Sequence, residues 1–136
     1  MKTHVLRTSI IALLVAVAGH AQSNLALHAN IPFSFVAGRA TLNAGQYRVD
    51  QGNRGLITLK SANGKTNAFL LTATQQCGGI QTASRLVFHR YGNTYILSQI
   101  WTQGDNCARQ ATVTKREREL AARQKASDET IILAMR

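Results

Sequence analysis

Residues Arg85–Trp101 read RLVFHRYGNTYILSQIW and carry the clearest fold signal in the chain. Gly92 and Asn93 lie between two apolar runs, a pattern typical of a β-hairpin with a tight turn. This turn predicts that Phe88 faces Leu97 across the hairpin. One face should carry Leu86, Phe88, Leu97 and Trp101, and the other Val87, Ile96 and Ile100. Because both faces are largely apolar, we expect this hairpin at the centre of a sheet.

The segment Leu25–Phe35 alternates apolar and more polar residues with a period of two. Such alternation is typical of a strand that buries one face. Pro32 has no N–H to donate to a neighbouring strand, so we expect the strand to lie at a sheet edge or to be interrupted there.

A second hairpin signal is Asn63-Gly64, the dipeptide preferred in type I′ turns with two loop residues. That turn places Thr58 opposite Phe69. By the same register, Ile57 should face Leu70. The polar segments Gln75–Ala83 and Thr102–Asn106 are predicted to be loops.

Thr114 is expected to begin the single helix of the chain. Thr114 and Glu117 match a capping box, and residues 115–125 are mostly good helix formers. The apolar stripe is thin and centres on Leu120, so the helix should lie on the surface. The final residues 127–136 are apolar enough to be buried, either as a strand or as a last helical turn.

Turn signals recur about every eight to twelve residues and separate six to seven short predicted strands. The sequence therefore predicts a mainly β fold: a small antiparallel β-sandwich or open barrel with one C-terminal surface helix.

The N-terminal segment has the features of a cleavable secretory signal peptide. Lys2 and Arg7 form a positive n-region, and Thr8–Ala18 is an uncharged, mostly apolar h-region of eleven residues. A helix of that length rises about 16 Å, roughly half of a bilayer core, so we do not expect a transmembrane anchor. A buried N-terminal core helix is the alternative interpretation.

The segment Gly19-His20-Ala21, with small residues at Gly19 and Ala21, precedes the expected cleavage site. We expect residues 1–21 to be removed, Gln22 to become the N-terminus, and the protein to be secreted or periplasmic. Residues 22–136, which are 115 residues, then suit a single β-rich domain. No stretch within them is long and apolar enough to predict a transmembrane segment.

The chain is basic, with 16 Lys and Arg against 6 Asp and Glu and a formal net charge of +10. Loss of Lys2 and Arg7 leaves 14 basic residues and a charge of +8. An exported basic protein meets anionic envelope polymers or lipid head groups rather than nucleic acid. We therefore expect anionic envelope partners and no nucleic acid.

The two cysteines, Cys77 and Cys107, both lie in the part expected to be mature. In an oxidising compartment they predict one disulfide, placed between loops on either side of the central hairpin. Two free thiols, or a redox or metal role, are the alternatives.

Few residues suggest catalysis. Of the 6 Asp and Glu residues, Asp50 and Asp105 are the pair to consider for acid–base chemistry. Both lie next to glycine-bearing turns, however, and turn aspartates usually bond their own backbone. The mature segment has two histidines, His28 and His89, and no acidic cluster that would suggest a metal site. We expect no catalytic residue, no metal, no cofactor and no enzymatic activity.

One stretch could bind a ligand at the end of the central hairpin. His89, Arg90, Tyr91 and Tyr95 combine charge and aromatic rings suited to an anionic or sugar ligand. Alternatively they have a purely structural role, in which His89 faces Ile96 and Arg90 stacks on Tyr95.

Three motifs in the chain resemble an uncharacterised family of small exported bacterial β-rich proteins. They are IPFSFVAG at Ile31–Gly38, LNAGQYRV at Leu42–Val49 and LVFHRYG at Leu86–Gly92. The family's corresponding patterns look like VPFxFxVGxKxLPAGTYxV and LVFHRYGDxYxLxxIW, followed by a basic helix. The similarity extends from about Asn30 to Leu120.

The chain departs from the family pattern in two turns. Asn43 stands where the family usually has proline, and Asn93 where it usually has aspartate. The resemblance implies an exported β-domain and transfers no catalytic or binding residue.

The favoured function is therefore that of an exported, non-enzymatic domain with a structural or interaction role in the envelope or outside the cell. A carbohydrate- or anion-binding module is the main alternative, and it should expose aromatic side chains in a groove. A small hydrolase is a third possibility, and it should bring polar side chains together in a pocket. The candidate aromatic residues are Tyr47, Tyr91, Tyr95 and Trp101.

The strand at residues 25–35 offers a further way to interact. It can pair within its own domain, or it can join other copies by β-strand addition, in which backbone hydrogen bonds provide the affinity. A head-to-tail contact of this kind builds filaments.

Overall fold

The computed structural model describes residues 26–124 and 130–135. The expected signal peptide, its cleavage site and Leu25 lie outside this part. Within residues 26–124 and 130–135, no helix has the length and apolar character needed to cross a bilayer.

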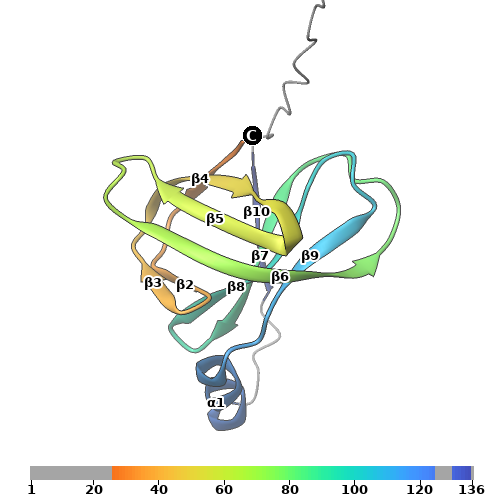
Figure 1. The fold of residues 1–136 in the computed structure, drawn as a ribbon. Coiled ribbons are helices and arrows are strands. Elements are labelled where there is room, and N and C mark those ends of the chain that lie inside the picture. Colours follow the sequence, from red (N-terminus) through yellow and green to blue (C-terminus); the bar gives the residue numbers. More distant parts are fainter. Residues whose placement is uncertain (1–25, 125–129, 136) are drawn as a thin grey trace, which may run out of the picture.

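The fold is mainly β with one α-helix near the C-terminus, as predicted (Figure 1). The elements are β1 (Leu27–Ile31), β2 (Phe35–Ala37), β3 (Ala40–Leu42), β4 (Gly45–Gln51), a short 3₁₀ turn η1 (Asn53–Gly55), β5 (Leu56–Ser61), β6 (Asn67–Cys77), β7 (Arg85–Tyr91), β8 (Thr94–Trp101), β9 (Cys107–Ala111), α1 (Lys115–Arg123) and β10 (Thr130–Ala134). The described part of the chain contains more strands than the six to seven expected.

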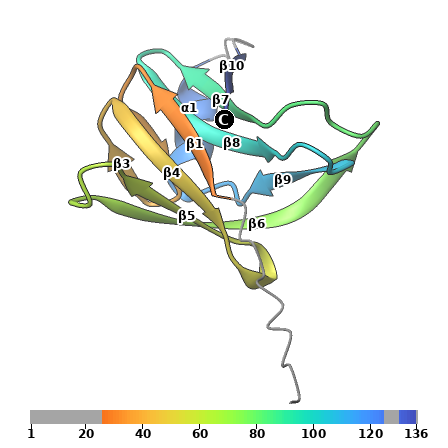
Figure 2. The same ribbon diagram turned by 90° about the horizontal axis from the view of Figure 1, so that it is seen from above.

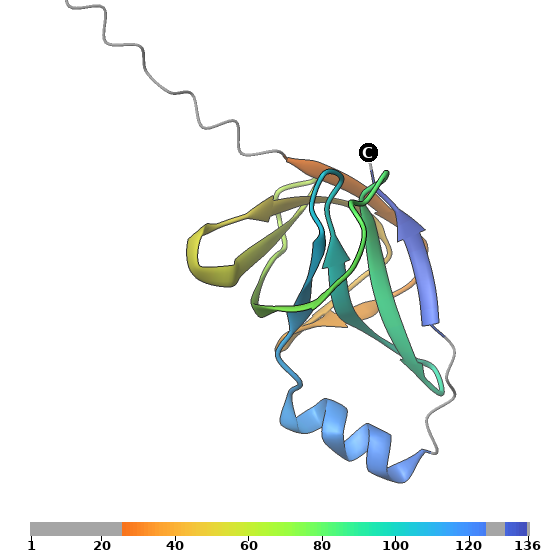
Figure 3. The ribbon, with the colours of Figure 1, turned by 90° about the vertical axis from the view of Figure 1, so that its right-hand side faces the viewer.

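All strands belong to one curled, open sheet (Figure 2). The hydrogen-bonded order is β1-β4-β5-β6-β9-β8-β2-β3, with β7 on β8 and β10 on β7. One edge of β8 is shared, because β2 pairs with it in parallel at Tyr95 and Ile96 while β9 pairs antiparallel at Gln99 and Ile100. The end strands β1 and β10 lie near each other without pairing in the described part of the chain (Figure 3).

The concave side of the sheet encloses the core. Phe35 and Phe88 are fully buried there and meet edge to face, with ring centroids 5.5 Å apart. The other large side chains that are fully buried are Ile31, Leu42, Val49, Ile57, Leu59, Leu70, Leu86, Leu97 and Ile100.

The central hairpin has the predicted pairing near its turn. Phe88 faces Leu97 and His89 faces Ile96. The expected division of its two faces is wrong at one end, because the register shifts between Val87 and Phe88 and leaves an extra residue in β8. Ile100 therefore joins the main core with Leu86 and Phe88, whereas Trp101 packs on the opposite face with Val87 and Ala108.

The expected first strand is interrupted at Pro32, between β1 and β2. Interruption at this residue was one of the two predictions, the other being a strand at a sheet edge. β1 alternates buried and exposed residues and pairs with β4 of the same chain. The chain then crosses over, and β2 pairs with β8 instead.

The hairpin between β5 and β6 has the predicted register, with Thr58 opposite Phe69 and Ile57 opposite Leu70. Its turn is not type I′, however. Gly64 N–H donates to the Ser61 carbonyl at 2.9 Å, and of the two expected loop residues only Gly64 has positive φ, at +69°. Asn63 and Gly64 therefore lie within a turn that is wider than the expected two-residue loop.

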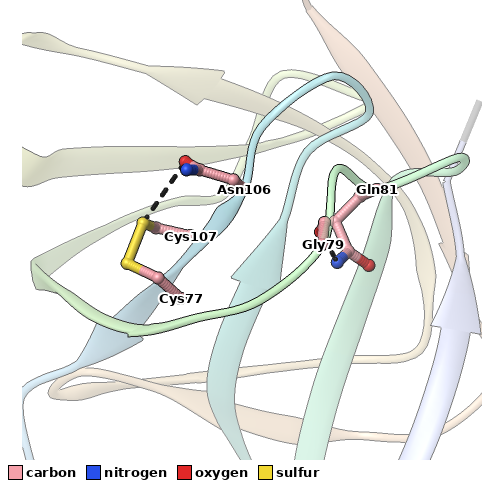
Figure 4. The surroundings of a disulfide bond; sticks show 5 residues. All are labelled: Cys77, Gly79, Gln81, Asn106 and Cys107. Atoms are coloured by element: carbon pink, nitrogen blue, oxygen red, sulfur yellow. Dashed lines mark hydrogen bonds between the residues drawn. A yellow bond between two sulfur atoms is a disulfide. The ribbon is translucent and has the colours of Figure 1, made fainter.

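Cys77 and Cys107 form the predicted disulfide, with their Cα atoms 4.0 Å apart (Figure 4). The two cysteines are cross-strand partners at the ends of β6 and β9, not members of flanking loops. The expected loop Gln75–Ala83 therefore begins only after Cys77, because β6 continues to the disulfide.

The helix begins where predicted. The Thr114 side chain accepts a hydrogen bond from the Glu117 N–H at 3.2 Å, and α1 ends at Arg123. The apolar tail forms β10, antiparallel to β7, so the strand alternative is correct for Thr130–Ala134.

Candidate interaction surface

The four residues expected to form a ligand site on the central hairpin lie on its two opposite faces. Arg90 lies over the ring of Tyr95, with its guanidinium carbon 5.6 Å from the ring centroid. Tyr95 is stacked on Phe33 in turn, at a centroid distance of 4.1 Å. The contact expected from the structural interpretation is thus present.

His89 and Tyr91 lie on the other face, under α1. The Tyr91 hydroxyl donates to the Glu117 carboxylate at 3.3 Å, and His89 Nδ1 lies 3.8 Å from the same carboxylate oxygen. Burial, and then the charge and hydrogen bond of Glu117, raise the pKa of Tyr91. The capping motif predicted the backbone contact of Glu117 but not this side-chain contact, which depends on how α1 docks.

The acidic residue at the end of β4 is neutralised by its neighbours. Asp50 lies 2.7 Å from Arg48 and 3.3 Å from Lys60. Burial tends to raise the pKa of Asp50, but the hydrogen bonds and charges of Arg48 and Lys60 outweigh it and leave the pKa lowered. Asp50 is therefore held ionised, and Asp105 lies exposed in the loop after β8.

The described residues contain no group of three or more His, Cys, Asp or Glu placed to hold a metal ion. His28 is exposed on β1, as its position in the alternation predicted.

Most of the candidate aromatic side chains are not available to a ligand. Tyr47, Tyr91 and Trp101 are buried, and Tyr95 is half-buried against the core. An exposed aromatic ring lies elsewhere: the side chain of Phe69 in β6 is 65 % exposed.

Phe69 belongs to an exposed apolar strip. Leu71 is 66 % exposed on the same face of β6, and Val113, in the segment that leads to α1, is 48 % exposed. The two segments are adjacent because Thr112 N–H donates to the Leu71 carbonyl at 3.0 Å. Ala68 and Leu70, which alternate with Phe69 and Leu71 along β6, are buried on the opposite face of the strand. β6 is therefore apolar on both faces here.

These three side chains line a hollow of about 1060 Å³ between β6, the β2–β3 turn and the start of α1. We call it the Phe69 groove. Its charged lining residues are all basic: Arg39, Lys115, Arg116 and Arg118. Arg116 also donates to Thr41 Oγ1 of β3 at 3.3 Å, which places the first turn of α1 against the β2–β3 hairpin.

A second hollow of about 1070 Å³ lies over β1, β4 and β5. Its charged or titratable lining residues are His28, Tyr47, Arg48 and Lys60. Arg48 and Lys60 already pair with Asp50. The Phe69 groove is the better candidate site because it combines exposed apolar side chains with a rim of basic residues.

Sequence reasoning did not select Phe69. The available signal was the unbroken apolar run Ala68–Leu71 in a predicted strand, which requires apolar residues on both faces. Comparison of the chain with protein-family models, curated proteins and solved structures found no match.

Proposed function

We propose that the chain is an exported, non-enzymatic binding domain that attaches to anionic components of the cell envelope through the Phe69 groove. The observation that carries the proposal is the combination of exposed Phe69, Leu71 and Val113 with a rim whose charges are all positive. Exposed apolar side chains grouped together mark interaction sites, and the basic rim selects an anionic partner.

Two features support export. The N-terminal sequence has the pattern of a signal peptide, and the Cys77–Cys107 disulfide is typical of proteins from oxidising compartments.

The alternative functions have less support. A carbohydrate-binding module stacks sugars on exposed rings, but Tyr47, Tyr91 and Trp101 are buried, and the exposed ring of Phe69 lies beside the aliphatic side chains of Leu71 and Val113 rather than beside a second exposed ring. A hydrolase needs a carboxyl group poised to exchange a proton, whereas Arg48 and Lys60 lower the pKa of Asp50.

Self-association through residues 25–35 also has less support. β1 already forms backbone pairs with β4 of its own chain, so strand addition would require those pairs to open.

The test uses the exported chain, purified from the periplasm or the medium, with its N-terminus sequenced. We expect the sequence to begin at Gln22. The chain should then sediment with isolated cell envelopes of the producing bacterium and be released by salt, because screening weakens exposed charge interactions.

A matched pair of variants locates the contact. Phe69→Ser should lower the bound fraction, whereas Ile80→Ser should not, since Ile80 is 74 % exposed but lies outside the Phe69 groove. A mature chain that begins at Met1, or equal loss of binding in both variants, would overturn the proposal.

A further inference from the structure

We propose that the anionic component is the surface of a lipid bilayer. Phe69, Leu71 and Val113 enter the boundary between head groups and acyl chains, and the basic rim binds lipid phosphates. This inference rests on the proposed function and names the partner of the same groove.

The apolar strip favours lipid over a polyanion. A wall polymer or other hydrophilic polyanion would satisfy the basic residues alone, but it would leave the exposed side chains of Phe69 and Leu71 in water. A bilayer surface provides an apolar region directly beneath its charged layer, so one partner satisfies both kinds of residue.

The basic rim favours an anionic surface. Lys115, Arg116 and Arg118 occupy the first turn of α1, where the helix dipole is already positive and cations are unfavourable. The acidic residue of this turn, Glu117, is buried against Tyr91 and His89. The ion pair of Lys115 with Glu119 is weak, because the two charged groups are 3.9 Å apart and largely exposed. Anionic head groups relieve this local excess of positive charge and attract each basic residue near the surface.

The same charges disfavour a second copy of the chain as the partner. Contact between two Phe69 grooves would bring two sets of Arg39, Lys115, Arg116 and Arg118 together. Like charges in juxtaposition oppose such a contact.

The side chains are also placed for a surface rather than for a single enclosed lipid. Phe69 and Leu71 are each about two-thirds exposed, so they project from β6 instead of lining a buried cavity. Their projection from one strand face next to α1 allows both to reach the same plane.

The experiment measures co-sedimentation of the sequenced, exported chain with two kinds of vesicle. One consists of phosphatidylcholine alone, and the other of equal amounts of phosphatidylcholine and phosphatidylglycerol. We expect binding to the anionic vesicles, little binding to the neutral ones, and weakening as salt is added.

Charge variants then test the site. Arg116→Glu with Arg118→Glu should lower the partition coefficient by at least about fivefold per residue, because each lost positive charge is worth that factor and each new carboxylate is also repelled by the anionic surface. Arg54→Glu with Lys65→Glu makes the same change in net charge at exposed positions outside the groove and should have a much smaller effect. Circular dichroism and thermal unfolding of all variants establish that they fold.

Separate outcomes distinguish the inference from the proposed function. Binding to envelopes that depends on Phe69, without binding to anionic vesicles, would overturn the inference and leave the proposed function in place. Equal binding to neutral and anionic vesicles, or equal loss in the two charge variants, would also overturn the inference. A groove-dependent interaction with an acidic protein in place of lipid would do the same.

Discussion

The hydroxyl group of Tyr91 in β7 donates a hydrogen bond of 3.3 Å to the buried carboxylate of Glu117 in α1. One turn further along the helix, Leu120 packs on the outer cluster that contains Tyr91 and Ile96. These contacts fix the first turn of α1 against the sheet. They therefore also fix Lys115, Arg116 and Arg118 at the rim of the Phe69 groove.

Removal of the Tyr91 hydroxyl should destabilise the protein. Tyr91→Phe keeps the ring but takes a donor away from the buried Glu117 carboxylate, and hydrogen bonds to charged groups are worth about 1.5–3 kcal/mol. We expect a loss of that order in the free energy of unfolding, measured by urea denaturation at neutral pH. A variant as stable as the wild type would show that the contact contributes nothing.

The same residue should make the fold sensitive to alkali. The pKa of Tyr91 is raised in the folded protein, first by burial and then by Glu117, so the folded state holds the proton more tightly than the unfolded chain. Its stabilising contribution is therefore complete below the unfolded pKa of about 10 and is lost as the pH rises through the folded value.

Urea denaturation across the alkaline range measures this dependence. Tyr91→Phe should show a shallower loss of stability with pH than the wild type. Some dependence should remain, because burial also raises the pKa of Tyr47. Identical alkaline slopes in both proteins would contradict the raised pKa of Tyr91.

Two glycines with similar backbone conformations should respond very differently to alanine. Gly55 has φ of +78° and Gly64 has φ of +69°. An alanine at either position would have to adopt this left-handed conformation, which destabilises the folded state by about 1–2 kcal/mol. At Gly55 the new Cβ would also lie 2.2 Å from the backbone oxygen of Thr72, whereas nothing lies within 4 Å at Gly64.

Thermal and urea unfolding of Gly55→Ala and Gly64→Ala measure the difference. We expect Gly64→Ala to cost only the conformational penalty. Gly55→Ala should cost a further 1–3 kcal/mol or so for the forced backbone shift. Equal losses would mean that η1 can move away from β6 without cost.

The Cys77–Cys107 disulfide closes a sequence separation of 30 residues. In the chain-entropy description, such a crosslink stabilises by about 3–4 kcal/mol. Reduction should lower the free energy of unfolding by that amount, and Cys77→Ala with Cys107→Ala should match the reduced wild type. If the reductant also destabilised the double variant, its effect could not be assigned to this bond.

The hairpin registers were predictable because they depend on local turn signals. The Gly92-Asn93 signal correctly predicts that Phe88 pairs with Leu97. The Asn63-Gly64 signal correctly predicts that Thr58 pairs with Phe69 although the turn is wider than expected, because the loop gains one residue on each side and the register stays the same. Alternation then failed beyond Val87, because the bulge there exchanges the faces of Ile100 and Trp101. A bulge depends on packing across the sheet and has no reliable signal in the strand itself.

The candidate site was less predictable than the fold. Glu117 has a capping signal, but its contact with Tyr91 requires α1 to dock against β7. The Phe69 groove requires the β2–β3 turn and the start of α1 to lie beside β6, and this follows from the crossover after Pro32. Such long-range juxtapositions arise from topology, which no single motif in the chain specifies.

Hydroxyl-radical footprinting of the native exported chain tests directly whether the Phe69 groove is the binding face. The chain is oxidised free and bound to isolated envelopes, and mass spectrometry measures modification at each exposed side chain. Phe69, Leu71 and Ile80 are 65 %, 66 % and 74 % exposed, so all three should react in the free protein. We predict that envelope binding protects Phe69 and Leu71 and leaves Ile80 unchanged; continued oxidation of Phe69 and Leu71 in the bound state would contradict an envelope-binding role for the groove.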